Sequence, residues 1–174
     1  MWLGVRSNEK SVCPNQLDHV VAGGLGLDEL DKLECVVKEC GEEAGFDMEV
    51  ARRAVEGGVV MYEGNDNWCY EERVGGGDGG VGGYKRDTLF TYDLEVLEGI
   101  VPKPVDGEVE RFELVDVEEV MEGLIESEGA RVRGEWGKVY KANCVPVIAE
   151  FMIRKGIIGK EFEGFEELFE CLRN

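Results

Sequence analysis

Three glutamates in one short stretch have a residue type and a spacing that suit chemistry with a metal ion. Glu42 and Glu43 follow Glu39 by three and four residues, so all three lie side by side if this stretch is helical. Carboxylates held that close repel one another unless a cation lies among them. Hard divalent ions prefer carboxylate oxygen, and Mg²⁺ commonly combines carboxylates with water and substrate phosphate. The cluster is therefore a candidate site for Mg²⁺.

The competing interpretation is that these glutamates only solvate the surface of a helix. The chain carries 38 Asp and Glu against 19 Lys and Arg, which gives a formal net charge of −19. In so acidic a chain, a glutamate-rich exposed face is common. Taken alone, the three glutamates favour the interpretation as a solvated helix face. The flanking residues are needed to distinguish this interpretation from a metal site.

The helix that must carry the glutamates is predicted by an apolar stripe. Its members recur at spacings of four and three residues: Leu33, Val37, Cys40 and Ala44. Gly45 follows as the residue expected to end the helix with a positive φ. On a helical wheel the glutamates lie on the side away from the stripe.

The other expected elements mix strands with helices. Strands are expected at residues 1–6, 17–22, 59–62, 88–96 and 108–114, and helices at 48–55, 117–125, 143–155 and 161–172. Asn143 is expected to cap its helix. The aromatic stripe of the last helix is expected to cover the core. This mixture with short connections predicts an α+β or α/β sandwich.

Length and composition bound the class of protein. A chain of 174 residues, 43% of them hydrophobic, suits one domain over 1–174 with a core of its own. No apolar stretch approaches the roughly 20 residues that cross a bilayer. The net charge of −19 argues against a nucleic-acid backbone as partner, because no run of Lys or Arg forms a basic patch. We expect neither nucleic acid nor a membrane as a partner.

Two further features are interpreted as structural. The glycines of 74–83 are not followed by Gly-Lys-Ser/Thr, so we expect a loop insertion at about 63–83 rather than a phosphate cradle. The six cysteines form no Cys-x-x-Cys pair and His19 is the only histidine, so we expect no zinc site. Reduced thiols in an intracellular compartment are the favoured interpretation. We assign His19 to ordinary packing.

The residues that flank the glutamates resemble the Nudix box. That motif reads Gly, five residues, Glu, seven residues, Arg-Glu, an apolar residue, any residue, Glu-Glu, any residue, Gly and an apolar residue. Residues 38–46, KECGEEAGF, match its second half and place Gly24 on the first glycine. Two positions depart from it: Lys38 stands where Arg is usual, and Leu30 stands where the first Glu is expected. Glu34, one turn before Lys38, is expected to pair with it as a substitute brace.

Other segments are similar to the thiamine-pyrophosphokinase-related Nudix hydrolases of eukaryotes. The similar segments are residues 2–7, 17–24, 84–95, 106–110 and 141–156. The resemblance covers most of the chain apart from 63–83. Members of that subfamily usually carry a further N-terminal domain and an opening strand of the Nudix fold. We find neither here, which leaves open whether the chain is a fragment or a truncated gene model.

The resemblance implies a Nudix-like α/β/α sandwich with a mixed sheet that lacks its first strand. It also implies hydrolysis of a diphosphate linkage in an NDP-X type or thiamine-diphosphate-like small molecule, with Mg²⁺ or Mn²⁺ as cofactor. Glu39, Glu42 and Glu43 match the metal-binding glutamates of the motif. The proton acceptor is left open between Glu43 and Glu108, with Glu110 next. The expected catalytic set is therefore Glu42, Glu43 and Glu108.

Four residues are expected to contact the substrate. Gly24 and Lys38 belong to the box. Lys85 and Arg86 stand at the entrance of a predicted strand, where they suit neutralisation of a phosphate group. Ordinary surface solvation accounts for Lys85 and Arg86 equally well.

Two functions from different classes remain. The intact glutamates favour an enzyme. The departures at Leu30 and Lys38 favour a Nudix-like module that has lost catalysis and binds a ligand or a protein. Cytoplasm and plastid are both open as the compartment.

Overall fold

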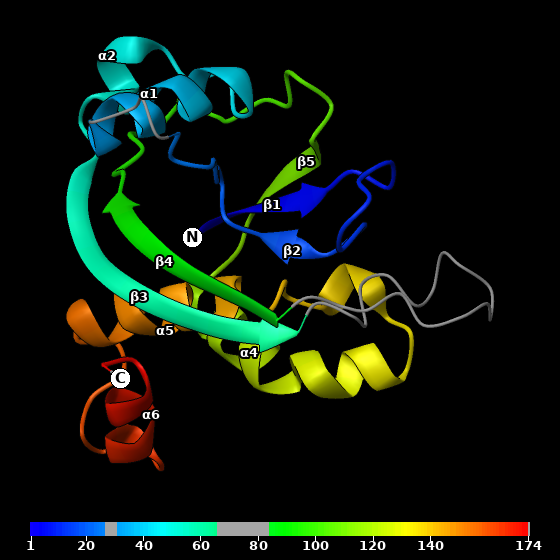
Figure 1. Ribbon diagram of the computed structural model, residues 1–174, viewed down its shortest axis with the longest axis vertical. Coiled ribbons are helices and arrows are strands. Elements are labelled where there is room, and N and C mark those ends of the chain that lie inside the picture. Colours follow the sequence, from blue (N-terminus) through cyan, green and yellow to red (C-terminus); the bar gives the residue numbers. More distant parts are fainter. Residues whose placement is uncertain (27–30, 66–83, 174) are drawn as a thin grey trace. The chain divides into compact units, whose positions relative to one another are not determined.

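The computed structural model describes residues 1–26, 31–65 and 84–173 (Figure 1). The chain divides into two compact units. The first comprises Met1–Val55 and Tyr92–Lys141, and the second comprises Glu56–Thr91 and Ala142–Asn174. Each unit therefore combines two segments that are separated in sequence. The single domain expected over 1–174 stays a prediction.

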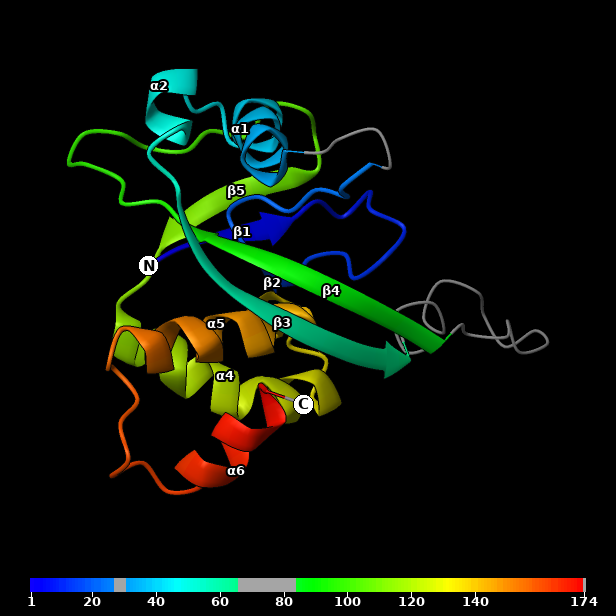
Figure 2. The same cartoon turned by 60° about the vertical axis from the view of Figure 1, so that its left-hand side comes forward.

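A three-stranded antiparallel sheet organises the first unit. β1 (Trp2–Arg6) lies between β2 (Leu17–Asp18) and β5 (Val109–Leu114), an order that can also be followed in Figure 2. Leu17 also forms an isolated parallel bridge with Tyr140. This bridge lies outside the named strands, and both strand pairs of the sheet are antiparallel, so the expected mixed sheet is not seen among the described residues of this unit.

Gly4 occupies the middle of this sheet. It pairs with Asp18 on one side and with Phe112 on the other. A Cβ atom on Gly4 would lie 2.9 Å from the carbonyl oxygen of His19. Glycine at this position therefore lets the chain around Asp18 and His19 approach β1 closely.

Helices complete the first unit. They are α1 (Lys32–Glu42), α2 (Met48–Ala51), α4 (Val117–Val132) and the short 3-10 helix η1 (Trp136–Lys138). Asp31 begins α1, because its Oδ1 atom accepts a 2.9 Å hydrogen bond from the backbone N–H of Leu33.

The predicted apolar stripe of α1 is confirmed in part. The buried core cluster consists of Val37, Cys40, Ala44, Phe46 and Ala51. Leu33, which is only partly buried, packs against this cluster. Burial of one face, more than helix propensity, therefore holds α1 in place.

A long two-stranded sheet and two helices form the second unit. β3 (Val55–Asn65) pairs with β4 (Tyr84–Asp93), and most of both strands belongs to this unit, together with α5 (Cys144–Arg154) and α6 (Phe165–Cys171). Thr91 joins the two strands. Its Oγ1 atom accepts a hydrogen bond from the N–H of Gly58 at 2.7 Å and donates to the carbonyl of Gly58 at 3.0 Å.

The fold class is confirmed as a mixture of helices and antiparallel sheets (Figure 1). Several boundaries differ from the prediction. The strand expected at 17–22 ends at Asp18, because the N–H of Ala22 donates to the carboxylate of Glu43 instead of to a strand. The helix expected at 117–125 continues to Val132, because Ser127 and Ala130 are buried on it.

The C-terminal elements show two further differences. Asn143 precedes α5, but its side chain makes no capping hydrogen bond. The last helix begins at Phe165 rather than at 161, because Gly164 before it adopts a left-handed conformation with φ 83°. No residue of α6 is buried, so its stripe is only half-covered, and Phe165 stacks on Phe169 at 5.6 Å between ring centroids.

The cysteines correct one expectation. Cys35, Cys40, Cys144 and Cys171 are free, as expected for reduced thiols. Cys13 is disulfide-bonded, so the expectation of reduced thiols is wrong for this residue.

The glycine tract at 74–83 and the aromatic residues Trp68 and Tyr70 lie outside the described residues. No helix in the described part is long and apolar enough to cross a membrane.

Replacing Thr91 by Val should destabilise the second unit by about 1–3 kcal/mol, because the N–H of Gly58 would lose its partner in a part-buried position. Thr88 lies exposed on the same strand, so Thr88→Val is the matched control and should cost less than about 0.5 kcal/mol. Urea unfolding followed by circular dichroism measures both. Equal stabilities of the two variants would contradict the role given to Thr91.

Candidate metal and phosphate site

The end of α1 sets the direction of the glutamates. Glu43 directly follows the last residue of α1, and its N–H donates to the carbonyl of Glu39 at 2.9 Å. Gly45 then turns the chain with φ 63°, and the N–H of Phe46 donates back to the carbonyl of Cys40 at 3.0 Å. This left-handed turn is the one predicted from Gly45. It brings Phe46 into the core while Glu43 faces the chain before the helix.

Two of the three glutamates lie against one short piece of backbone. The Oε2 atom of Glu43 accepts a hydrogen bond from the N–H of Ala22 at 3.3 Å. The side chain of Glu39 packs on Gly23, where a Cβ atom would fall 2.3 Å from its Oε1 atom. Residues 22–23 therefore position both carboxylates.

The three glutamates do not share one solvated face. Glu43 is buried, with 7% of its surface exposed, and the side chain of Glu39 is 15% exposed. The side chain of Glu42 is 57% exposed. The simple solvated surface therefore does not account for Glu39 and Glu43, because acids are almost never buried unless a partner compensates them.

The glycine selected by the motif is not the one that the packing requires. A Cβ atom on Gly24 would meet nothing within 4 Å. Gly23 is the residue whose missing side chain makes room for Glu39. Spacing alone could not separate the two, because the sequence offers adjacent glycines.

Lys38 and Glu34 have other partners than expected. The Nζ atom of Lys38 lies 3.8 Å from the Oε1 atom of Glu39 and 3.9 Å from the Oε2 atom of Glu42. Glu34 makes a two-pronged pair with Arg52, at 2.7 and 2.9 Å. The predicted Glu34–Lys38 brace is therefore wrong. Leu30 lies outside the described residues.

Glu108, the residue directly before β5, lines the same pocket as Glu43. A pocket in the first unit is lined by Gly4, Arg6, Asp18, His19, Ala22, Glu43, Glu108 and Val109. Lys10 fixes Glu108 through a 2.6 Å ion pair with its Oε2 atom. Glu110 pairs with Arg111 on the exposed side and does not line this pocket. Of the candidate proton acceptors, the structure brings Glu43 and Glu108 together.

The surroundings of Glu43 disfavour its negative charge. The pKa of Glu43 is raised from its ordinary 4.5 to about 7, chiefly by burial. The negative charges of Glu39, Glu108 and Asp106 contribute to this rise, and the hydrogen bond from the N–H of Ala22 opposes it. The pKa of Cys40 rises to about 11, through burial first and then through Glu43 and Glu39.

The chemistry of the donor set suits a hard divalent cation, but the oxygens of the three glutamates do not all lie within 4.8 Å of one another in this structure. The residues offer carboxylate oxygens only, from Glu39, Glu42 and Glu43, and the first and last of these are held in place by backbone contacts. A cation among them would favour their charged forms and relieve the repulsion that raises the pKa of Glu43.

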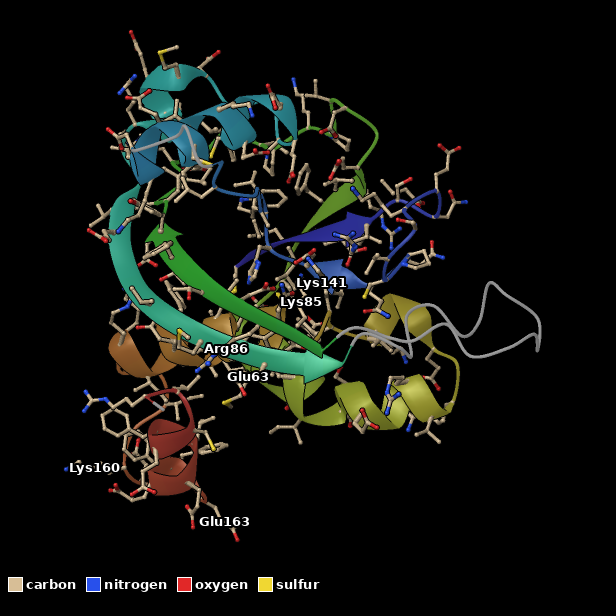
Figure 3. The ribbon with its side chains drawn as sticks, in the orientation of Figure 1. Glu63, Lys85, Arg86, Lys141, Lys160 and Glu163 are labelled. Carbon is tan, nitrogen blue, oxygen red and sulfur yellow. The ribbon has the colours of Figure 1, made fainter. Side chains whose placement is uncertain are left out.

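The two basic residues expected at the substrate belong to the second unit. Lys85 pairs with Asp87 at 2.9 Å. Arg86 pairs with Glu63 at 2.7 Å, and both of these residues are labelled in Figure 3. Their contact with substrate stays a prediction, and each has an acidic neighbour in its own unit.

A second charged cluster in the first unit was not predicted. Asp18 is buried, and its Oδ2 atom accepts from Arg6 at 2.7 Å and from Lys141 at 2.9 Å. Its Oδ1 atom accepts from the N–H of His19 at 2.9 Å. The positive charge of Lys141 is the largest of the effects that lower the pKa of Asp18, against the opposing effect of burial. The sequence held one signal for this cluster: Asp18 is an acid within a predicted strand that is otherwise largely apolar.

Glu43→Gln should stabilise the cation-free protein at pH 8 by up to about 3 kcal/mol. The folded protein holds the Glu43 proton up to about pH 7 and the unfolded chain loses it near 4.5, so wild-type stability falls as the pH rises through this window. Glutamine has no such loss, and the difference should largely vanish at pH 5. Urea unfolding in EDTA at both pH values measures it.

Glu42→Gln is the control for this prediction. It removes the same charge from an exposed position of the same helix and should change stability by less than about 0.5 kcal/mol at either pH. A Glu43→Gln protein that is no more stable than wild type at pH 8 would contradict the cost assigned to burying the Glu43 charge beside other acids.

Gly23→Ala should weaken divalent-cation binding, because the new methyl group displaces the Glu39 carboxylate. Gly24→Ala is the matched control and should bind like wild type. The rise in melting temperature on adding Mg²⁺ measures both. A larger loss in Gly24→Ala than in Gly23→Ala would show that the motif glycine, not the packed one, positions the site.

Comparison with known proteins identifies the family. Residues 1–133 match the model of the NUDIX domain. The chain is 40% identical over 177 residues to "Nudix hydrolase 20, chloroplastic" of Arabidopsis thaliana and 37% identical over 174 residues to "Nudix hydrolase 24, chloroplastic" of the same plant, and both alignments cover 100% of the chain. An uncharacterized protein of Saccharomyces cerevisiae is 32% identical over 169 residues, 93% of the chain.

These relatives are longer proteins. The chain spans 40%, 41% and 43% of their respective lengths. The match to the domain model covers most of the chain, and it contains the α1 glutamates, the preceding glycines and Glu108. The chain therefore belongs to the Nudix family.

Proposed function

We propose that this protein hydrolyses a diphosphate linkage in a small molecule, with Mg²⁺ or Mn²⁺ held by Glu39, Glu42 and Glu43. The observation that carries the proposal is the seating of Glu39 and Glu43 on residues 22–23, beside a pocket that also contains Glu108. Membership of the Nudix family and the names of the two Arabidopsis relatives support a hydrolase.

The arrangement suits the chemistry of a diphosphate. A diphosphate is a poor electrophile because its negative charge repels a nucleophile. When bound, a divalent cation neutralises that charge and lowers the pKa of a water molecule. Lys38, between Glu39 and Glu42, adds a positive charge at the rim of the acidic cluster.

Glu108 is our choice for the proton acceptor. Glu43 already accepts the N–H of Ala22 and is assigned to the metal. Glu108 lines the same pocket, is half-exposed and is fixed by Lys10. A carboxylate that lines the pocket is placed to accept a proton from a water molecule bound there. In this scheme Glu42 and Glu43 act through the metal.

The substrate class is proposed from the resemblance to the thiamine-pyrophosphokinase-related subfamily. It favours thiamine diphosphate or a similar compound over other NDP-X type diphosphates. Gly24, Lys38, Lys85 and Arg86 remain the proposed substrate contacts. The word chloroplastic in the names of the two Arabidopsis relatives supports a plastid over the cytoplasm as the compartment.

The activity test uses the chain with Mg²⁺ and a panel of nucleoside and thiamine diphosphates, with phosphate release as the readout. We expect Glu42→Gln and Glu43→Gln to lose at least about 100-fold in kcat/KM. Glu49→Gln, an exposed acid on α2, is the control and should keep full activity. Release that is absent from every substrate, or unchanged in both variants, would refute the enzyme.

Glu108→Gln separates the proposed base from the metal ligands. It should lower kcat while leaving the Mg²⁺-induced rise in melting temperature intact, because Glu108 is not assigned to the metal. Stabilisation by Mg²⁺ without turnover of any substrate would instead support a binding module that has lost catalysis.

A further inference from the structure

The pocket beside the glutamates has an acidic lining. Glu43, Glu108 and Asp18 all contribute to it. Arg6 lines the pocket as well, but it already forms a 2.7 Å ion pair with Asp18. The negative charges of Glu43 and Glu108 therefore depend on other partners.

Glu43 and Glu108 have partners of different kinds. Glu43 accepts the N–H of Ala22, a neutral backbone group, at 3.3 Å. Glu108 has a full positive charge beside it, because the Nζ atom of Lys10 lies 2.6 Å from its Oε2 atom. The side chains of this ion pair are 27% and 47% exposed. Exposed ion pairs contribute little to stability, so the pair can be removed with little cost to the fold.

The segment that carries Lys10 also holds the main chain of Glu108. The backbone N–H of Ser7 donates to the carbonyl of Glu108 at 2.9 Å. The N–H of Lys10 donates back to the carbonyl of Ser7 at 3.2 Å, which closes a tight turn over residues 7–10. The N–H of Glu108 donates to the Oδ1 atom of Asp106 at 2.9 Å. The turn therefore brings Lys10 back to the acid whose main chain its first residue holds.

An irregularity in the sheet distinguishes Glu108 from Glu110. Regular alternation would place these two acids on the same face of a strand. The register of β1 against β5 shifts between Val5 and Arg6, so Glu110 has no counterpart in β1. Glu110 pairs instead with Arg111 on the exposed side. Bulges of this kind redirect side chains, and here Glu108 is the acid that lines the pocket beside a lysine.

We propose that Lys10 is the positioning residue for Glu108 in the reaction. Lys10 holds the Oε2 atom, so that the Oε1 atom is presented for the proton of a water molecule. The inference rests on the proposed diphosphate hydrolysis with Glu108 as proton acceptor. The positive charge of Lys10 also opposes recruitment of Glu108 to the metal, because a cation beside a carboxylate weakens its attraction for a second one.

Steady-state kinetics of Lys10→Met tests this role. The substrate is the member of the nucleoside and thiamine diphosphate panel that the wild type hydrolyses fastest with Mg²⁺. Methionine removes the charge and keeps an unbranched chain. We expect kcat to fall by about 10- to 100-fold with little change in KM, because a misplacement of about 1 Å can cost this much. Lys138→Met is the matched control, because Lys138 is 73% exposed in the same unit and pairs with Glu135.

Two further variants show whether Lys10 acts through Glu108. Lys10→Arg keeps a cation at this position and should recover most of kcat. In a Glu108→Gln protein, Lys10→Met should have no further effect on kcat, because the group that it positions is already lost. Melting of each variant without Mg²⁺ checks folding. The rise in melting temperature on adding Mg²⁺ should be at least as large in Lys10→Met as in the wild type.

The outcomes separate this inference from the proposed function. In an active wild type, a Lys10→Met kcat within about twofold of wild type would overturn the positioning role and leave the hydrolase standing. A raised KM with unchanged kcat would also overturn it, because Lys10 would then bind substrate. So would a loss that persists in full in the Glu108→Gln background. Absence of turnover by the wild type on every substrate would refute the hydrolase itself, and this role with it.

Discussion

The contact between two carboxylates and the backbone of residues 22–23 is the constraint on which the site depends. Glu43 takes the N–H of Ala22, and Glu39 fills the space that Gly23 leaves open. That contact ends β2 early, fixes the approach of the chain to α1 and holds negative charge where burial opposes it. The apolar stripe of α1 provides the compensating stability, because it anchors the helix in the core.

The charges of the first unit are sorted into opposing groups. The glutamates gather at the end of α1, and the cations Arg6 and Lys141 gather on Asp18. Most described acids outside these groups are exposed, so the net charge of −19 describes the surface more than the pocket. The electrostatic field of the protein favours a polyanionic ligand only where burial strengthens the effect of a few positive charges.

The sequence predicted the elements well where a period or a motif was present. The stripe of α1, the stop at Gly45 and the position of β1 followed from local pattern. The cluster around Asp18 could not follow, because Arg6, Asp18 and Lys141 meet only through strand pairing and tertiary contact. The choice between Gly23 and Gly24 also depended on packing, since spacing treats neighbouring glycines alike. Glu34 turned to Arg52 because α2 packs beside α1, a contact that no helical wheel contains.

The interleaving of the two units along the chain has a consequence for biosynthesis. β1 is made well before one of its partners, β5, which begins only at Val109, and Lys141 closes the first unit. The glutamate helix therefore leaves the ribosome long before the pocket beside it can exist. During that interval the unfinished chain exposes a Glu-rich helix and an unpaired strand edge to solvent. Contacts between segments so distant in sequence also form slowly. The high negative charge then has a role before any ligand is bound, since mutual repulsion keeps unfinished chains apart.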